Sequence, residues 1–191
     1  MLLLVPKRLR RSNSATERHM SKVLVTLDYE ELEYCAHAGV NRQIRALQKN
    51  RVSPTKDLDY AKQNYWSSHI TGVIGEYAVS KALGEHWVDL GQDRGGFDVL
   101  SYQVRATEQT KPMLRVRAHN NFEHMYILAQ VRKNRVLIHG WASGHDVKQF
   151  GILEYENCWS LHADGLNDMS LLIHPIIYTS QVTEWEAPDY Q

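Results

Sequence analysis

The sequence has little cysteine, no net charge and no long hydrophobic run, and each of these narrows the class of protein. Only two cysteines, Cys35 and Cys158, occur among 191 residues. Because they lie far apart and lack metal-type spacing, neither a disulfide framework nor a zinc ribbon is indicated. No apolar run approaches the roughly 18 to 20 residues that cross a bilayer. We therefore expect a soluble protein of a reducing cytoplasm that makes no membrane contact.

The charge balance limits how the chain could bind nucleic acid. Lysine and arginine number 22, aspartate and glutamate also 22, and the formal net charge is zero. A neutral protein lacks the general positive field of basic DNA-binding proteins. Any contact with DNA or RNA must therefore come from a local basic patch.

Residues 1–19 differ in composition from the rest of the chain. They contain five basic residues and one acid, a balance of plus four, so the remainder carries minus four. Met20 is a plausible second start. The extension is interpreted either as a disordered or non-native tail or as a basic arm that contacts nucleic acid. The remaining composition, residues 20–191, is that of one globular domain.

A strand and an amphipathic helix are predicted after this extension. Val23–Leu27 has strand character, and Asp28 is placed to cap the following helix. Apolar residues recur in the helix at steps of three or four. These residues are Leu32, Cys35, Ala36, Val40, Ile44 and Leu47. Arg42 and Arg45 near the helix end either line a nucleic-acid groove or are solvated charges that complement the helix dipole.

A second helix is predicted to end at Leu83, with Gly84 as its C-cap. It carries one acid in mostly small and apolar surroundings, Glu76. Gly72 and Gly75 precede this acid. They would let another backbone or a phosphate come close, or they serve helix packing.

The second half of the chain reads mainly as short strands joined by turns. Strand-like runs alternate with glycine-rich or polar turns, and a short helix is predicted over Gly144–Gln149. The predicted strands are His86–Leu90, two pieces within Phe97–Thr107, Leu114–Arg117, Tyr126–Val131 and Arg135–Trp141. Two helices followed by a run of strands indicate an α+β or mixed α/β domain.

The segment from Asp98 to Arg105 combines an acid, an amide and a base. Asp98 begins one strand piece, and Gln103 and Arg105 lie on the next. Since side chains alternate along a strand, Gln103 and Arg105 point to the same side, while Val104 points into the core.

Asp98, then Gln103-x-Arg105 on the next strand, with Glu76 on the preceding helix, resembles the PD-(D/E)XK nuclease superfamily. The order of Gly72–Ala78 and the strands that follow is similar to small phage-type members, over roughly residues 64–150. The resemblance implies a restriction-endonuclease-like core. Such a core has a mixed central sheet of about four to five strands with flanking helices.

The resemblance also implies that the protein is a DNA nuclease that uses Mg²⁺ or Mn²⁺. Such a nuclease would act in the cytoplasm, which is that of the host if the gene belongs to a phage. Such an ion polarises the phosphoryl oxygen and generates hydroxide from bound water, and Mg²⁺ prefers oxygen ligands. The implied metal ligands are Asp98, Gln103, the Val104 carbonyl and Glu76. Arg105 would bind the scissile phosphate.

The sequence departs from the superfamily pattern at two positions, and these departures suggest an alternative function. Gln103 stands where the pattern has an acid, which removes one negative charge. Arg105 replaces a lysine; it cannot act as a base but can bind a phosphate with two hydrogen bonds. A catalytically impaired nucleic-acid-binding protein, or a structural component of a phage, is therefore a second hypothesis.

A local basic patch is predicted near this segment. Its members are Arg94, Arg105, Lys111, Arg115 and Arg117. Alternatively, Arg115 and Arg117 form only the solvated side of an edge strand.

Overall fold

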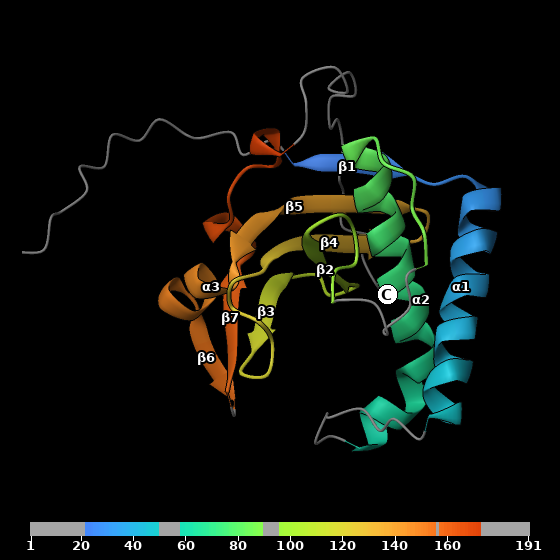
Figure 1. Ribbon diagram of the computed structural model, residues 1–191, viewed down its shortest axis with the longest axis horizontal. Helices are drawn as coiled ribbons and strands as arrows, with labels where there is room; N and C mark the ends of the chain where they lie inside the picture. Colours follow the sequence, from blue (N-terminus) through green and yellow to red (C-terminus); the bar gives the residue numbers. More distant parts are fainter. Residues whose placement is uncertain (1–21, 50–57, 90–95, 156, 173–191) are drawn as a thin grey trace, which may run out of the picture.

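The computed structural model describes residues 22–49, 58–89, 96–155 and 157–172. Over these residues the chain is a mixed α/β protein with three α-helices and two β-sheets (Figure 1). The helices are α1 (Tyr29–Gln48), α2 (Leu58–Leu83) and α3 (Gly144–Phe150). The strands are β1 (Val23–Thr26), β2 (Tyr102–Thr107), β3 (Met113–Arg117), β4 (Met125–Arg132), β5 (Arg135–Ser143), β6 (Ile152–Tyr155) and β7 (Cys158–His162). Two short 3₁₀ turns follow, η1 (Ala163–Gly165) and η2 (Met169–Leu171).

The larger sheet is mixed and has the strand order β1-β5-β4-β2. Strand β2 pairs with β4 in parallel, whereas β4 with β5 and β5 with β1 are antiparallel. The smaller sheet, β3-β7-β6, is antiparallel throughout. The predicted mixed sheet of four to five strands is therefore confirmed, and strand β2 forms one of its edges.

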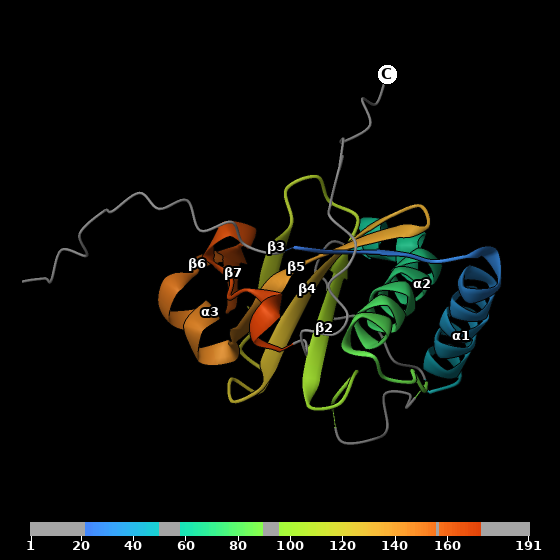
Figure 2. The ribbon, with the colours of Figure 1, turned by 90° about the horizontal axis from the view of Figure 1, so that it is seen from above.

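The four-stranded sheet lies between the helices α1 and α2 and the three-stranded sheet (Figure 2). Its two faces build separate cores. Ile127 and Ala129 of β4 pack with α2, whereas Tyr126 and Leu128 pack with the three-stranded sheet. Strand β4 is therefore buried on both faces. In the parallel register Arg105 lies beside Leu128, so the Arg105 side chain is on the face of the smaller sheet.

Both predicted signals at helix ends are confirmed. The Asp28 side chain accepts a hydrogen bond from the Glu31 backbone N–H at 2.8 Å, and the Glu31 carboxylate accepts one from the Asp28 backbone N–H at 2.9 Å. This reciprocal pair satisfies two N–H groups that a helix start leaves unpaired. Gly84 ends α2 with a positive φ of 73°, a conformation that glycine adopts without strain.

The predicted apolar face of α1 is wrong in part, because the helix contact runs through its small residues. Cys35, Ala38 and Gly39 are buried, but Ile44 and Leu47 are exposed. A Cβ atom on Gly39 would lie 2.6 Å from the Ile70 Cα atom of α2. The close approach of α1 and α2 at this glycine turns the larger residues toward solvent.

The strands predicted on either side of the glycine-rich loop are also wrong. His86–Asp89 is extended without sheet pairing, and its Trp87 ring packs edge-on against Tyr34 of α1. The first piece of Phe97–Thr107 is reduced to one bridge between Val99 and Tyr102. Aromatic packing and a tight turn replace sheet pairing in these segments. Leu90 and residues 93–95, which belong to the predicted strand and loop, are outside the described residues.

The two glycines that precede Glu76 have different environments. A Cβ on Gly75 would lie 2.5 Å from the Ala106 Cβ atom of β2, whereas a Cβ on Gly72 would meet no heavy atom within 4 Å. Gly75 therefore serves the packing of α2 on β2.

Replacing these two glycines by alanine should change stability in opposite directions. Gly75→Ala should lower the free energy of unfolding by about 1–3 kcal/mol, because helix and strand must separate. Gly72→Ala should leave it unchanged or raise it by up to about 1 kcal/mol, because alanine favours helix. Urea denaturation of both variants measures this difference, and equal effects would contradict the packing.

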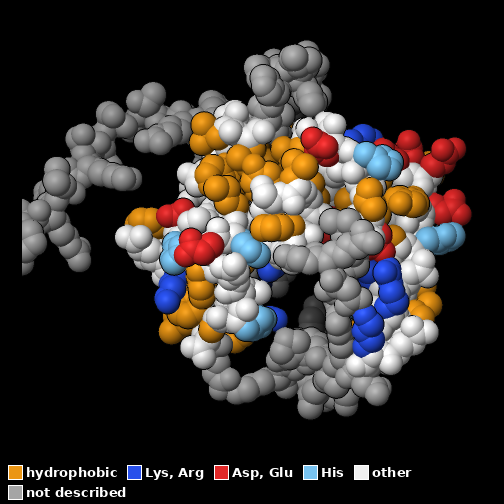
Figure 3. Space-filling view, viewed as in Figure 1, with side chains coloured by type: hydrophobic (Ala, Val, Ile, Leu, Met, Phe, Trp, Pro, Cys, Tyr) orange, Lys and Arg blue, Asp and Glu red, His pale blue; other side chains and the backbone are white. Residues whose placement is uncertain are grey.

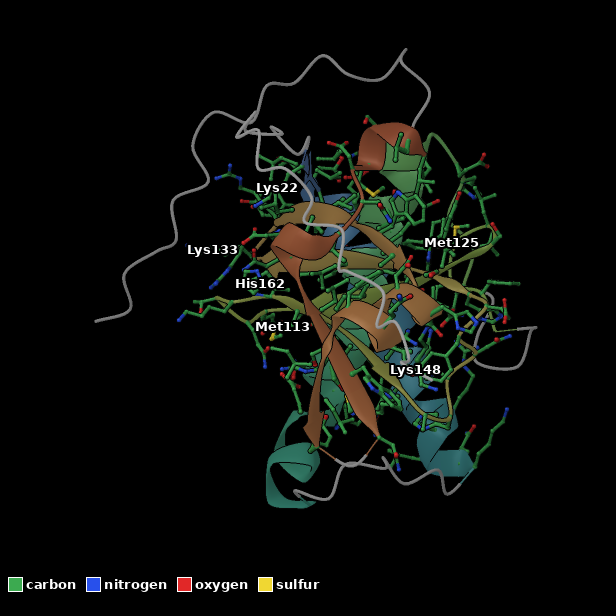
Figure 4. The ribbon with its side chains drawn as sticks, turned by 90° about the vertical axis from the view of Figure 1, so that its left-hand side faces the viewer. Lys22, Met113, Met125, Lys133, Lys148 and His162 are labelled. Atoms are coloured by element: carbon green, nitrogen blue, oxygen red, sulfur yellow. The ribbon has the colours of Figure 1, made fainter. Side chains whose placement is uncertain are left out.

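Strand β5 carries a buried histidine where its pairing with β4 is irregular. His139 is 5% exposed, and its Nε2 atom is 3.0 Å from the Gln130 Oε1 atom. The Gln130 amide nitrogen donates to the Gln109 carbonyl at 2.7 Å, so Gln130 Oε1 accepts from a His139 ring that is neutral. The pKa of His139 is lowered from 6.5 to about 4, mainly by burial. The charges of Lys22 and His162, which lie on one side of the molecule in Figure 4, contribute to the lowering, and the charge of Asp164 opposes it.

This histidine should make stability fall in acid. The depressed pKa means that the unfolded chain takes up a proton between the ordinary value of 6.5 and about 4, whereas the folded chain does not. Stability should therefore be lost as the pH falls through this window, by up to about 3 kcal/mol from this residue. Urea denaturation from pH 7 to 4 measures it. His139→Gln should flatten the slope, and exposed His119→Gln should not; equal slopes in all three proteins would contradict it.

None of the helices within the described ranges has an apolar stretch long enough to span a bilayer.

Candidate active site at the edge of the four-stranded sheet

Among the described residues no strand pairs with the outer edge of β2, and four of the residues that the sequence singled out lie at this edge. Asp98 lies in a tight turn in which the Tyr102 N–H donates to the Val99 carbonyl at 2.8 Å. This turn brings the Asp98 carboxylate back to the strand, where Oδ2 accepts a hydrogen bond from the Val104 N–H at 2.8 Å. The acid is therefore held at the edge of the sheet by the backbone of the strand that also carries Gln103.

Three oxygen atoms converge on one point at this edge. The Arg105 Nη1 atom lies 3.2 Å from the Val104 carbonyl oxygen, 3.3 Å from Gln103 Oε1 and 3.9 Å from Asp98 Oδ2. The structure thus brings together four of the residues predicted for the site. The point on which the three oxygens converge is taken by a guanidinium nitrogen of the fourth residue.

Arg105 is held from its other side by an aromatic ring. Its guanidinium carbon lies 5.0 Å from the centre of the Tyr126 ring, and the side chain is 30% exposed. Burial lowers the pKa of Arg105, and the charge of Asp98 opposes that change. An arginine stays protonated in proteins, so Arg105 is a permanent positive charge at the site.

The Asp98 carboxyl also has a shifted pKa. Burial raises the pKa of Asp98, and the Val104 N–H and the Arg105 charge oppose the rise. Burial destabilises the carboxylate form, while the hydrogen bond and the nearby cation stabilise it.

Glu76 lies in an ion pair on the helical side of the sheet. Its two carboxylate oxygens accept hydrogen bonds from Arg42 Nη1 at 2.7 Å and Nη2 at 2.6 Å, and the two side chains are only 8% and 14% exposed. Burial raises the pKa of Glu76, Arg42 opposes this, and the charge of Asp98 adds to it. The charge of Asp98 thus acts on Glu76, but the Glu76 carboxylate accepts its two hydrogen bonds of 2.6 and 2.7 Å from Arg42.

Arg42 is the main residue of this region that the sequence argument did not assign to the site. Its Nε atom also donates to Asp89 at 2.9 Å, and Arg45, one turn later, pairs with the same aspartate. Burial opposes a charged guanidinium, but the hydrogen bonds and charges of Glu76 and Asp89 raise the pKa of Arg42. The small and apolar residues around Glu76 in the sequence indicate that this carboxylate is buried. A buried carboxylate requires a cationic partner, which is the role of Arg42.

The predicted basic patch is only partly assembled. Arg115 donates to Glu154 of β6 at 2.8 Å, so its charge is paired within the smaller sheet. Lys111 is exposed and Arg117 half-buried. The charge of Arg117 contributes to lowering the pKa of Arg105, after the larger effect of burial. Arg94 and residues 1–19 lie outside the described residues.

On the face drawn in Figure 3, lysine and arginine side chains gather over part of the helical layer, and hydrophobic side chains form a patch in the upper part of the view.

The oxygen atoms at the edge of β2 are of the types that bind a divalent cation. A carboxylate, an amide oxygen and a backbone carbonyl are ligands that Mg²⁺ accepts. Among the described residues there is no group of three or more histidine, cysteine, aspartate or glutamate side chains that could hold a metal. A metal at this site would depend on Gln103 and the Val104 carbonyl beside its one carboxylate.

No protein-family model, curated protein or solved structure matches this chain.

Proposed function

We propose that the chain is a metal-dependent DNA nuclease of the PD-(D/E)XK type, with a restriction-endonuclease-like core. The observation that carries this proposal is the convergence of the Asp98, Gln103 and Val104 oxygens at the outer edge of β2. No strand of the described part of the chain pairs with this edge, which leaves room for a phosphodiester backbone to approach, and the charge of Asp98 raises the pKa of Glu76.

Each residue has a distinct role in this proposal. Asp98, Gln103 and the Val104 carbonyl would hold Mg²⁺ or Mn²⁺, which when bound polarises a phosphoryl oxygen and lowers the pKa of a water molecule. Arg105 would bind the non-bridging oxygens of the scissile phosphate with its planar guanidinium. Arg42 would keep the buried Glu76 ionised, so that a second negative charge stays near the ion.

The second candidate is a nuclease-fold protein that binds nucleic acid without cutting it. Three features favour it. Gln103 supplies no charge, Arg105 lies among the ligand oxygens, and Arg42 neutralises Glu76. In this case Arg105 and Arg117 would bind phosphates and the metal would be dispensable. A phage-encoded protein of either kind would act in the host cytoplasm.

Incubation of the purified protein with DNA separates the two candidates. Supercoiled plasmid and end-labelled single-stranded DNA are incubated with Mg²⁺, with Mn²⁺ or with EDTA, and binding is followed by gel retardation. A nuclease cuts in the presence of metal and stops in EDTA. A binding protein retards DNA equally in all three and cuts none. A protein that neither cuts nor retards DNA contradicts both.

A further inference from the structure

The Arg105 guanidinium bonds to neighbouring oxygen atoms of the protein, although the proposed function assigns it to a phosphate. Its Nη1 atom hydrogen-bonds the Gln103 amide oxygen and the Val104 carbonyl, and lies 3.9 Å from the Asp98 carboxylate. These are the same three oxygens that the proposed function assigns to the metal. The guanidinium therefore interacts with the three oxygen atoms that would bind the metal.

A divalent ion and this guanidinium cannot share the three oxygens. Mg²⁺ binds oxygen at about 2.0–2.1 Å, so an ion at the convergence point would lie within contact distance of Nη1 in its present position. Two like charges at such a distance repel strongly in a half-buried site. The formal charge of Asp98, Gln103 and Arg105 together is already zero, so the group has no net attraction for a second cation.

Arg105 is accessible to a phosphate from solvent. Its side chain is 30% exposed, and one face of the guanidinium is over the Tyr126 ring. A phosphate bound by the exposed part of the guanidinium would draw Nη1 away from the strand edge.

We propose that Arg105 is a tethered cation that occupies the metal position in the free protein, and that a nucleic-acid phosphate displaces it so that phosphate and metal bind together. This inference rests on the proposed function and concerns the regulation of the same site. It makes metal affinity depend on the presence of DNA. A free protein that binds metal weakly is thereby kept from activating water without its substrate.

Removing the charge of Arg105 tests the competition directly. Mn²⁺ binding to the DNA-free protein is measured by electron paramagnetic resonance for wild type, Arg105→Gln and Arg105→Gln/Asp98→Asn. Glutamine can still donate to the Val104 carbonyl, which protects the fold. The single variant should bind Mn²⁺ at least tenfold more tightly than wild type, and the double variant should lose this gain. Equal or weaker binding by folded Arg105→Gln overturns the inference.

A second measurement uses wild type alone, in case the variant does not fold. An uncleavable phosphorothioate oligonucleotide should raise the Mn²⁺ affinity of the protein at least tenfold, after subtraction of the ions bound by the oligonucleotide itself. Unchanged affinity overturns the inference. The outcome is separate from that of the nuclease proposal. DNA-coupled metal binding without cleavage supports the inference and contradicts the nuclease, and cleavage without the coupling does the reverse.

Discussion

An Arg42→Ala variant is expected to lose about 3–5 kcal/mol of its free energy of unfolding. The Glu76 carboxylate accepts two hydrogen bonds from the Arg42 guanidinium, and the pair is almost fully buried. Removing the arginine leaves a buried charge without its partner, which is among the costliest single changes in a protein core. Urea denaturation at neutral pH measures the loss.

Two further variants test whether the loss of stability comes from the buried charge that Arg42→Ala leaves unpaired. Arg45→Ala removes a more exposed arginine that pairs with Asp89, and should cost no more than about 1 kcal/mol. Arg42→Met/Glu76→Met should recover most of the stability, because neither charge remains. A loss in Arg42→Ala as small as that in Arg45→Ala would contradict the buried pair.

The pH dependence of the Arg42→Ala deficit has a definite sign. Without Arg42, the burial that raises the pKa of Glu76 is unopposed by its cation. A carboxyl whose folded pKa is raised costs stability as the pH rises through that pKa, because the folded state then carries the buried charge. The deficit should therefore be largest at neutral pH and shrink in acid. A deficit that grows in acid would contradict this assignment.

Asp98→Asn is expected to reduce metal-dependent DNA cleavage by at least about a hundredfold while leaving the fold intact. The asparagine side chain keeps an oxygen that can accept from the Val104 N–H, so the turn at the strand edge retains its hydrogen bond. The change removes the only carboxylate among the three converging oxygens, and with it the anionic ligand for the ion. Loss of a group that stabilises the charged transition state typically costs this much.

Initial rates of plasmid nicking, with circular dichroism as the check on folding, measure this effect. Glu123→Gln is the matched control, because this exposed acid pairs with His145 of α3 and should cut at the wild-type rate. An Asp98→Asn protein that is folded and cuts as fast as wild type would remove Asp98 from the reaction.

The features predicted correctly from the sequence are those that depend on local spacing. Asp28 and Gly84 could be placed because capping acts within one turn of a helix. Tyr126–Val131 and Arg135–Trp141 were predicted as buried strands, and the structure confirms them as β4 and β5. Strands β6 and β7 were not predicted; all four side chains of β6 are exposed, so it shows no alternation of buried and exposed residues.

The site was predictable only within its own short segment. Asp98 and Gln103 lie on one turn and its following strand, so their spacing already predicts proximity. The pair of Arg42 with Glu76 joins residues 34 positions apart, and depends on the close packing of α1 and α2 at Gly39. The direction of the Arg105 side chain is set by the ring of Tyr126 on another strand, which periodicity does not reveal.

The location of Mn²⁺ by anomalous diffraction, in crystals of the protein with a short uncleavable DNA, tests the proposed metal site directly. We expect one ion bonded to Asp98, Gln103 and the Val104 carbonyl, with Arg105 turned onto a phosphate of the DNA. An ion bound elsewhere, or DNA bound with Arg105 still on the Val104 carbonyl and no ion at that edge, would contradict it.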